Sequence, residues 1–186
     1  ASIESWYGKL TGHFGESSAV SAFYLKNVQG LDGNSVDPDI KGAHVHAWGA
    51  GATIDLGDSG LNIDGDFIQT RGNRDLGHAN LWTAGLNYGK VDLNKPGSFT
   101  LGVHYVRADA GAYLLGNSAL DMTDQLEYGW DNGTGVKFWV AKAGVAVQKN
   151  VELDAYYNFG AKAFDRYDDS TKDPANTWGV ELNYAF

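Results

Sequence analysis

The feature that most constrains this chain is a strict alternation of apolar and polar residues in its last two segments. In Asn176–Phe186 the even positions hold Trp, Val, Leu, Tyr and Phe, while the odd positions hold small or polar residues. Val151–Lys162 alternates in a similar way. A period of two is typical of a β-strand with two chemically different faces, whereas a helix repeats every 3.6 residues. Both segments are therefore predicted to be strands.

The same pattern recurs upstream and predicts about nine strands in all. Many of the 25 glycines lie within these apolar stretches, where each would cost a helix roughly 1 kcal/mol relative to alanine. Two strands have an ambiguous face, which a β-bulge near Val140 and another near Gly49 would explain. The upstream segments read as strands are Ser2–Phe14, Ser18–Val28, Gly42–Leu56, Val136–Lys149 and the stretches around Leu61–Phe67, Trp82–Tyr88 and Phe99–Tyr105.

The connections between these strands alternate in length, which places short turns at one rim and long loops at the other. The longest are Gln29–Lys41, Ala108–Gly135 and Ala163–Ala175. The strands exceed the ~5–6 residues usual in soluble sheets and match the ~9–11 that cross a bilayer at a tilt. A soluble β-sandwich would also alternate. Strand length and the two-rim pattern favour a single all-β domain over 1–186, an up-and-down antiparallel transmembrane β-barrel with about 8–10 strands in this chain.

Aromatic residues gather near the predicted strand ends, as they do where a barrel meets the membrane–water interface. The residues predicted to form such lipid-facing girdles are Trp82, Tyr88, Phe99, Tyr105, Trp139, Phe159, Trp178 and Tyr184.

The segment 178–186, Trp-Gly-Val-Glu-Leu-Asn-Tyr-Ala-Phe, resembles the C-terminal assembly signal of bacterial outer-membrane proteins, with Phe186 as its terminal Phe. This resemblance implies delivery to the outer-membrane assembly machinery and insertion as a β-barrel beside lipopolysaccharide. The stretch 147–157, Val-Gln-Lys-Asn-Val-Glu-Leu-Asp-Ala-Tyr-Tyr, together with the last strand, is similar to the closing hairpin of porins that some Gram-negative Firmicutes tether by an S-layer-homology domain.

The strand number leaves two barrel architectures open. Nine strands would place the first residue on the extracellular side, whereas single-chain bacterial barrels have an even number of strands. An eight-stranded barrel with a preceding periplasmic segment satisfies this rule, and so does the C-terminal portion of a porin of ~16 strands. The first has an interior filled by side chains, and the second encloses a water channel.

If the aromatic faces meet lipid, the opposite faces line the interior. Acidic side chains outnumber lysines there, and an acid-rich lumen concentrates cations. We therefore expect an outer-membrane pore for passive diffusion of small hydrophilic solutes, with a mild preference for cations. The alternative is a sealed structural, adhesive or binding barrel that acts through its long loops. The predicted pore-lining residues are Asp64, Asp66, Glu152, Asp154, Glu181, Lys9 and Lys142.

The longest loop contains the one helical pattern, Ala119–Glu127, with Leu126 among the side chains that could rest on the wall. Either this segment narrows the pore or it caps the outer rim, which we favour because long loops are usually surface features. A third reading extends the hairpin through the turn signal Asp131–Asn132–Gly133. The acidic residues spaced to form a constriction are Asp121, Asp124 and Glu127.

Composition and motifs exclude most other functions. A net charge of −9 argues against a nucleic-acid partner, and the lack of cysteine excludes disulfides and zinc–thiolate sites. His44 and His46 are spaced as two metal ligands without a third. No nucleophile-elbow, phosphate-loop or zinc-protease motif occurs. We predict no cofactor, no metal and no enzymatic activity, and we expect oligomers as in many porins. The weakest alternative is a barrel hydrolase using His13, His78 or His104.

Overall fold

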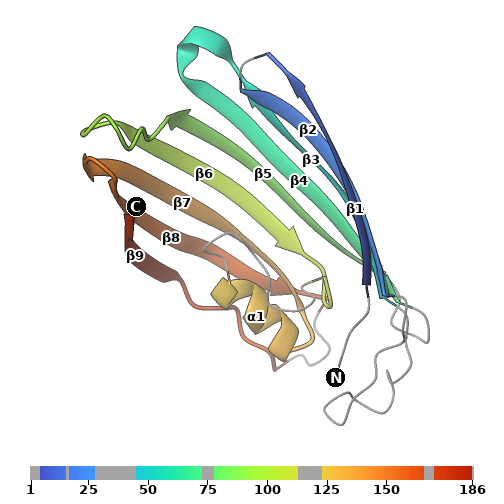
Figure 1. Ribbon diagram of the computed structural model, residues 1–186. Coiled ribbons are helices and arrows are strands. Elements are labelled where there is room, and N and C mark those ends of the chain that lie inside the picture. Colours follow the sequence, from blue (N-terminus) through green and yellow to red (C-terminus); the bar gives the residue numbers. More distant parts are fainter. Residues whose placement is uncertain are drawn as a thin grey trace.

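Nine strands follow one another in chain order and form one antiparallel sheet (Figure 1), which confirms the all-β, up-and-down fold. The computed structural model describes residues 5–15, 17–27, 45–72, 78–112, 123–165 and 170–185. The strands are β1 Ser5–Phe14, β2 Ser18–Asn27, β3 Val45–Asp55, β4 Leu61–Gly72, β5 His78–Gly89, β6 Phe99–Ala108, β7 Gly135–Gln148, β8 Val151–Phe164 and β9 Thr177–Tyr184. A 3₁₀-helix, η1 Gly57–Ser59, and one α-helix, α1 Thr123–Asp131, complete the described elements.

The predicted two-rim pattern is present with one exception. At the rim we call the turn rim, connections join β1 to β2, β3 to β4, β5 to β6 and β7 to β8. The exception is the β5–β6 connection, which is longer than the β4–β5 connection at the opposite rim. The β3–β4 turn is closed by the Leu56 N–H, which donates to the Leu61 carbonyl at 2.9 Å, and Gly60 adopts a left-handed φ of 69° there. The opposite rim, the loop rim, carries the long connections, including the one that contains α1.

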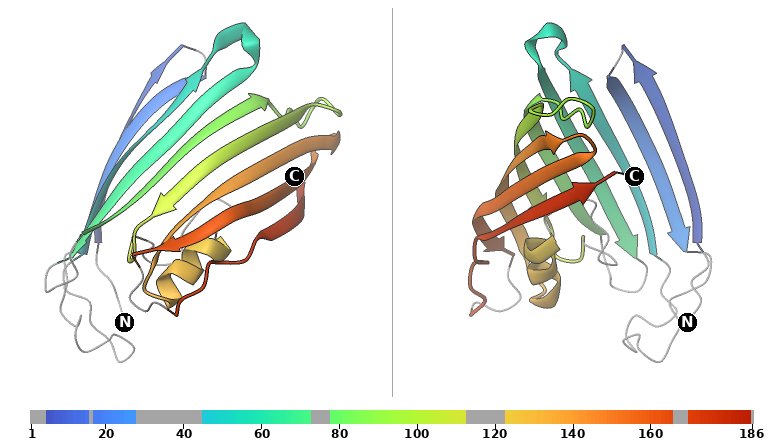
Figure 2. Two further views of the ribbon diagram at one scale, coloured as in Figure 1. Left: turned by 180° about the vertical axis from the view of Figure 1, so that it is seen from behind. Right: turned by 60° about the vertical axis from the view of Figure 1, so that its left-hand side comes forward.

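The sheet curves into an open trough, with α1 on its concave side near the loop rim (Figures 1 and 2). Partners in the ladders fix which side chains share a face: Leu86 lies opposite both Ile63 and Val103. These residues and their neighbours in register form the convex face, which is apolar except near the loop rim. β1 and β9 are the two edges of the sheet, and the described parts of these strands do not pair with each other.

One of the two irregularities expected in the sheet is present and the other is not. The register of β3 runs through Gly49 without a break, so the bulge predicted there is wrong. A Cβ at Gly49 would collide with the Phe23 ring, so the glycine serves close packing. The irregularity predicted near Val140 is confirmed: between β7 and β8 the register shifts at Lys137/Trp139, and the extra residue lies on β8, where Gly160 has a φ of 63°. A second shift, between Ala146 and Gln148, was not predicted.

The buried core lies on the concave face near the loop rim. Phe138, Val106 and Val140 are fully buried there, and Leu126 of α1 joins them. The helix therefore covers only one side of the trough. Within the described residues, no helix is long and apolar enough to span a membrane.

Candidate functional site

The concave face holds every charged residue that the sequence assigned to the interior. The ladders place Asp64 and Asp66 of β4 on this face together with Lys142 of β7. Asp154 of β8 lies directly opposite Glu181 of β9. Lys9, Glu152 and the residue Asp55, which sequence reasoning missed, share the face. All carboxylates in the described strands therefore point to the concave side.

A hydrogen-bonded cluster crosses β4, β5 and β6 at the middle of this face. His104 is buried and contacts the Asn87 Oδ1 through Nε2 at 2.9 Å, and its Nδ1 lies 3.4 Å from the Asp64 Oδ2. Asn87 Nδ2 donates to Asp64 Oδ1 and, at 2.9 Å, to Asn62 Oδ1. Both ring nitrogens of His104 are thus engaged by side chains of the wall itself.

Glycine makes room for these polar side chains. A Cβ at Gly85 would collide with the His104 ring, and one at Gly51 would collide with the Asp66 carboxylate. Both glycines lie on the concave face, opposite Asp64 and Asp66 respectively. A large polar side chain on one strand is therefore paired with a glycine on the neighbouring strand. The missing Cβ of the glycine leaves the space that the polar side chain occupies.

A second acidic group lies near the turn rim on β8 and β9. Asp154 and Glu181 face each other across the strands, an arrangement of like charges that is unfavourable unless a cation approaches. Asn183 Nδ2 donates to Asp154 Oδ2 at 2.8 Å and holds the carboxylate in place. Glu152, opposite Asn183, extends the group to the rim. The arrangement attracts cations to this half of the concave face.

The loop half of the same face is apolar because α1 packs on it. Leu126, 2% exposed, contacts the cluster formed by Val106, Val136, Phe138 and Val140. The prediction that Leu126 rests on the wall is confirmed. The helix lies against the concave wall, so our preference for a segment that only caps the rim is wrong; burial of its apolar side chains favours the inward position.

Polar bonds fix α1 to the last strands. Gln125 Nε2 donates to the Thr177 Oγ1 at 2.9 Å and to the Ala175 carbonyl at 3.1 Å. Its Oε1 accepts from Asn158 Nδ2 at 2.8 Å. Tyr128 OH donates to the Lys172 carbonyl at 2.6 Å. Helix, β8 and the segment before β9 therefore form one bonded unit.

The bounds of the helix differ from the prediction. It continues past Glu127 to Asp131 and ends where Gly133 takes a φ of 57° and the Thr134 N–H donates to the Gly129 carbonyl at 3.0 Å. The Asp131–Asn132–Gly133 signal is thus a helix terminus, a common use of glycine, and not a hairpin turn.

The acids predicted to form a constriction are only partly described. Asp124 and Glu127 are exposed on α1, away from its packed side. Asp121, like most of the first half of the predicted helix, lies outside the described residues.

The predicted girdle residues all lie on the convex face. Trp82 and Tyr105 have ring centroids 5.2 Å apart, and Tyr105 and Trp139 are 5.0 Å apart. The row continues where the sequence did not place it, with Trp48 and Phe67 at 5.2 Å. Tyr88 and Phe99 form a second contact, at 6.1 Å, near the turn rim. The remaining predicted members on this face are Phe159, Trp178 and Tyr184, while Phe186 lies outside the described residues.

The histidines considered as metal ligands do not form a site in the described chain. His46 lies on the convex face beside Tyr24, with ring centroids 6.2 Å apart, and His44 is outside the described residues. Among the described residues, no three His, Cys, Asp or Glu side chains gather closely enough to hold a metal ion.

Neither protein-family models nor curated proteins provide a match to this chain. Interpretation of the site therefore rests on the geometry of its two faces.

Proposed function

We propose that this protein spans the bacterial outer membrane as part of a β-barrel and forms a diffusion pore for small hydrophilic solutes, with a mild preference for cations. The observation that carries the proposal is the separation of chemistry between the two faces of one sheet. The convex face is apolar and aromatic, and the concave face holds all the carboxylates of the described strands.

The convex face supports contact with lipid because its large apolar side chains have no protein cover. Leu10 is 78% exposed and Trp178 is 73% exposed, and the pattern extends over every strand. An apolar surface of this extent is unfavourable in water. Aromatic rows toward both rims, with aliphatic and small residues between them, match the band and girdles of a membrane barrel.

Strand direction supports a barrel wider than these nine strands. Consecutive strands are antiparallel, so β1 and β9 run in the same direction. Closing the sheet by pairing these two edges would require a parallel ladder, whereas bacterial barrels close with antiparallel strands. An odd number of additional strands between the edges satisfies that rule and widens the interior.

The acid-rich concave face supports a preference for cations. The carboxylates of β4, β8 and β9 outnumber Lys9 and Lys142, and their field lowers the energy of a cation in the lumen. Helix α1 covers the wall on the side of β7 and β8 and would narrow such a lumen near the loop rim.

The packing of α1 also favours a second candidate, a sealed barrel that acts through its loops. The apolar cluster around Leu126 would close a narrow interior at the loop rim. In that case the carboxylates would form hydrogen bonds and ion pairs within the wall and would not contact a permeating ion.

Single-channel recording in a planar bilayer separates the two. The folded protein is added to a neutral-lipid bilayer with a KCl gradient, and insertion is verified by protease protection in vesicles of the same lipid. The pore predicts discrete ohmic steps with a cation-selective reversal potential. A silent bilayer with inserted protein would retire the pore and leave the sealed barrel, and a protein that does not insert would overturn the membrane proposal itself.

A further inference from the structure

The cations of the convex face gather at one end of the strands. No described strand residue on this face carries a carboxylate, and the five Lys and Arg residues on it all lie at the loop rim. These residues are Lys26, Arg71, Arg107, Lys137 and Lys162. Among the described strand residues of the convex face, charge is therefore confined to the loop rim and is entirely positive.

Three of these cations form a row in register. Lys137 of β7 lies directly opposite both Arg107 of β6 and Lys162 of β8. We call these three residues the cationic row. Adjacent strands are only about 4.8 Å apart, and like charges directly opposite each other destabilise a sheet. An anion placed over the row would remove that repulsion.

The cationic row lies level with Trp82 and one step beyond Tyr105 and Trp139. Trp82 is the ladder partner of Arg107. Trp139 follows Lys137 on the same face of β7 and is the ladder partner of Tyr105. Two residues along a strand span about 6–7 Å. If the aromatic row lies at the membrane–water interface, the cationic row is at the depth of lipid headgroups.

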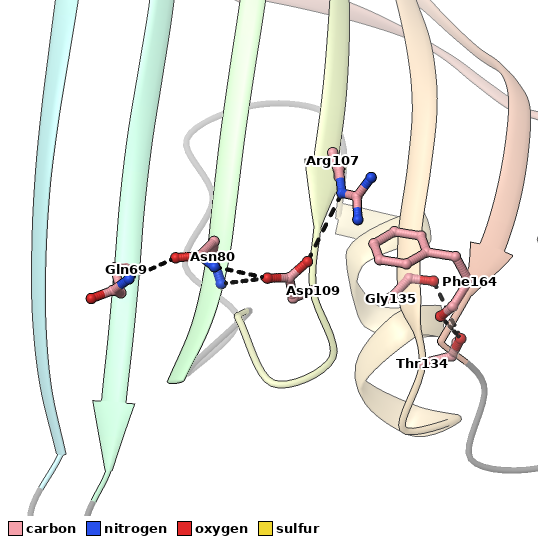
Figure 3. A network of polar contacts seen from close by, with 7 residues as sticks. All are labelled: Gln69, Asn80, Arg107, Asp109, Thr134, Gly135 and Phe164. Carbon is pink, nitrogen blue, oxygen red and sulfur yellow. Dashed lines mark hydrogen bonds and ion pairs between the residues drawn. The ribbon is translucent and has the colours of Figure 1, made fainter. Parts of the chain in front are cut away.

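The guanidinium of Arg107 lies between an acidic and an aromatic neighbour (Figure 3). Its Nε lies 3.9 Å from the Asp109 Oδ1, and its Cζ lies 4.2 Å above the Phe164 ring. Asn80 holds the other Asp109 oxygen through its backbone N–H at 3.0 Å and its Nδ2 at 3.1 Å, and Gln69 Nε2 donates to Asn80 Oδ1 at 2.9 Å. Within the described chain, the two Nη groups of Arg107 make no hydrogen bond.

The two lysines differ in exposure but share the lack of a carboxylate partner among the described residues. Lys162 is exposed and Lys137 is half-buried, and neither forms an ion pair with a carboxylate of the described residues. A planar guanidinium with free Nη groups binds two oxygens of a phosphate, and two ammonium groups beside it complete the charge balance.

We propose that the cationic row binds the phosphate of an anionic glycolipid in the membrane leaflet at the loop rim. This inference rests on the proposed membrane function. A lipid phosphate fits better than free phosphate because the aromatic row directly beneath provides an apolar surface for the rest of the lipid molecule. In barrels of this type the long loops face the outside of the cell, so the cationic row would lie in the outer leaflet.

The test is a titration of the folded protein in neutral detergent micelles with bis-phosphorylated lipid A, followed by the shift in thermal unfolding. Dephosphorylated lipid A and inorganic phosphate are titrated in parallel. We expect tight binding of the phosphorylated lipid alone. The triple variant Arg107→Gln, Lys137→Gln, Lys162→Gln should bind it about 100-fold more weakly, since each cation near an anionic headgroup contributes about a factor of five.

The matched control neutralises three cations at the turn rim: Lys90→Gln, Lys95→Gln, Lys149→Gln. These are exposed, and their loss changes the net charge equally. It should bind lipid A like the unmodified protein, as should the charge-conserving variant Lys137→Arg, Lys162→Arg. Equal weakening by both triple variants would show attraction by net charge and overturn the site, as would equal binding of the dephosphorylated lipid or of inorganic phosphate.

Insertion separates this inference from the function on which it rests. Each variant is placed in phosphatidylcholine vesicles and tested for protease protection. A protein that inserts but whose lipid A affinity is insensitive to the cationic row overturns the inference alone. A protein that fails to insert overturns the membrane proposal and the inference together.

Discussion

The two halves of the concave face are built on the same strands by different means. On β6, His104 and Val106 are successive residues on this face, yet His104 belongs to a polar cluster with Asp64, while Val106 is fully buried in an apolar one with Leu126. The difference is α1, which covers the loop half, whereas no described element covers the turn half. Whether a residue on this wall is polar or apolar thus depends on whether α1 covers it, and not on which strand it belongs to.

Under the proposed function, the two halves of the wall have different roles. The apolar loop half holds α1 in place and so determines the shape of the lumen near the loop rim. The polar turn half carries the charges that a passing solute meets. The two halves should therefore respond to mutation in different measurements, stability for the first and ion preference for the second.

The largest expected effect is on stability, from Phe138→Ala in the loop half. Phe138 is fully buried beneath α1, and truncating a buried Phe costs about 3–5 kcal/mol. The free energy of unfolding is measured by circular dichroism during guanidinium titration in detergent micelles. The control is Trp139→Ala, the next residue on the convex face, which is 44% exposed and should cost clearly less. Equal losses from the two variants would show that α1 does not build a core.

A smaller loss is expected from Asn87→Leu in the turn half. The change removes the amide that bonds Asp64, Asn62 and His104, and unsatisfied partners cost about 1–3 kcal/mol. The same unfolding titration measures it. Asn94→Leu, on the exposed β5–β6 turn, is the control and should be neutral. A loss as large as that from Phe138→Ala would mean that the polar cluster, and not the packing of α1, dominates the stability of the wall.

The strands and their faces could be predicted from the sequence because one face alternates so cleanly with the other. Trp178, Val180 and Leu182 on the convex side and Glu181 on the concave side follow from period two alone. The positions of charges on the concave face follow in the same way, once each strand is recognised.

Contacts between distant segments could not be predicted in this way. His104 contacts Asp64 only because β5 pairs with both β4 and β6, in a register that places Gly85 directly between the two side chains. Likewise, Gln125 reaches Thr177 across a long sequence separation. The position of α1 was misjudged because its apolar side chains are few, and their partner surface on β6 and β7 is visible only in three dimensions.

The smallest change in the free energy of unfolding is expected from neutralising the carboxylates of β8 and β9, a change that tests the turn half alone. Neutralising Glu152→Gln, Asp154→Asn and Glu181→Gln removes charges but no apolar packing, so stability should change by less than about 0.5 kcal/mol. Because these carboxylates lie together on β8 and β9, their loss should move the reversal potential in a KCl gradient toward zero.

The matched control for that prediction carries the same change in net charge in the connections between strands: Asp58→Asn, Asp92→Asn, Asp165→Asn. All three are exposed, and Asn tolerates the positive φ of 49° at Asp165. If the control shifts the reversal potential as far as the turn-half variant does, ion preference arises from the charge of the whole molecule. If only the turn-half variant shifts it, the permeating ion passes the wall formed by β8 and β9, and the carboxylates there act on it directly.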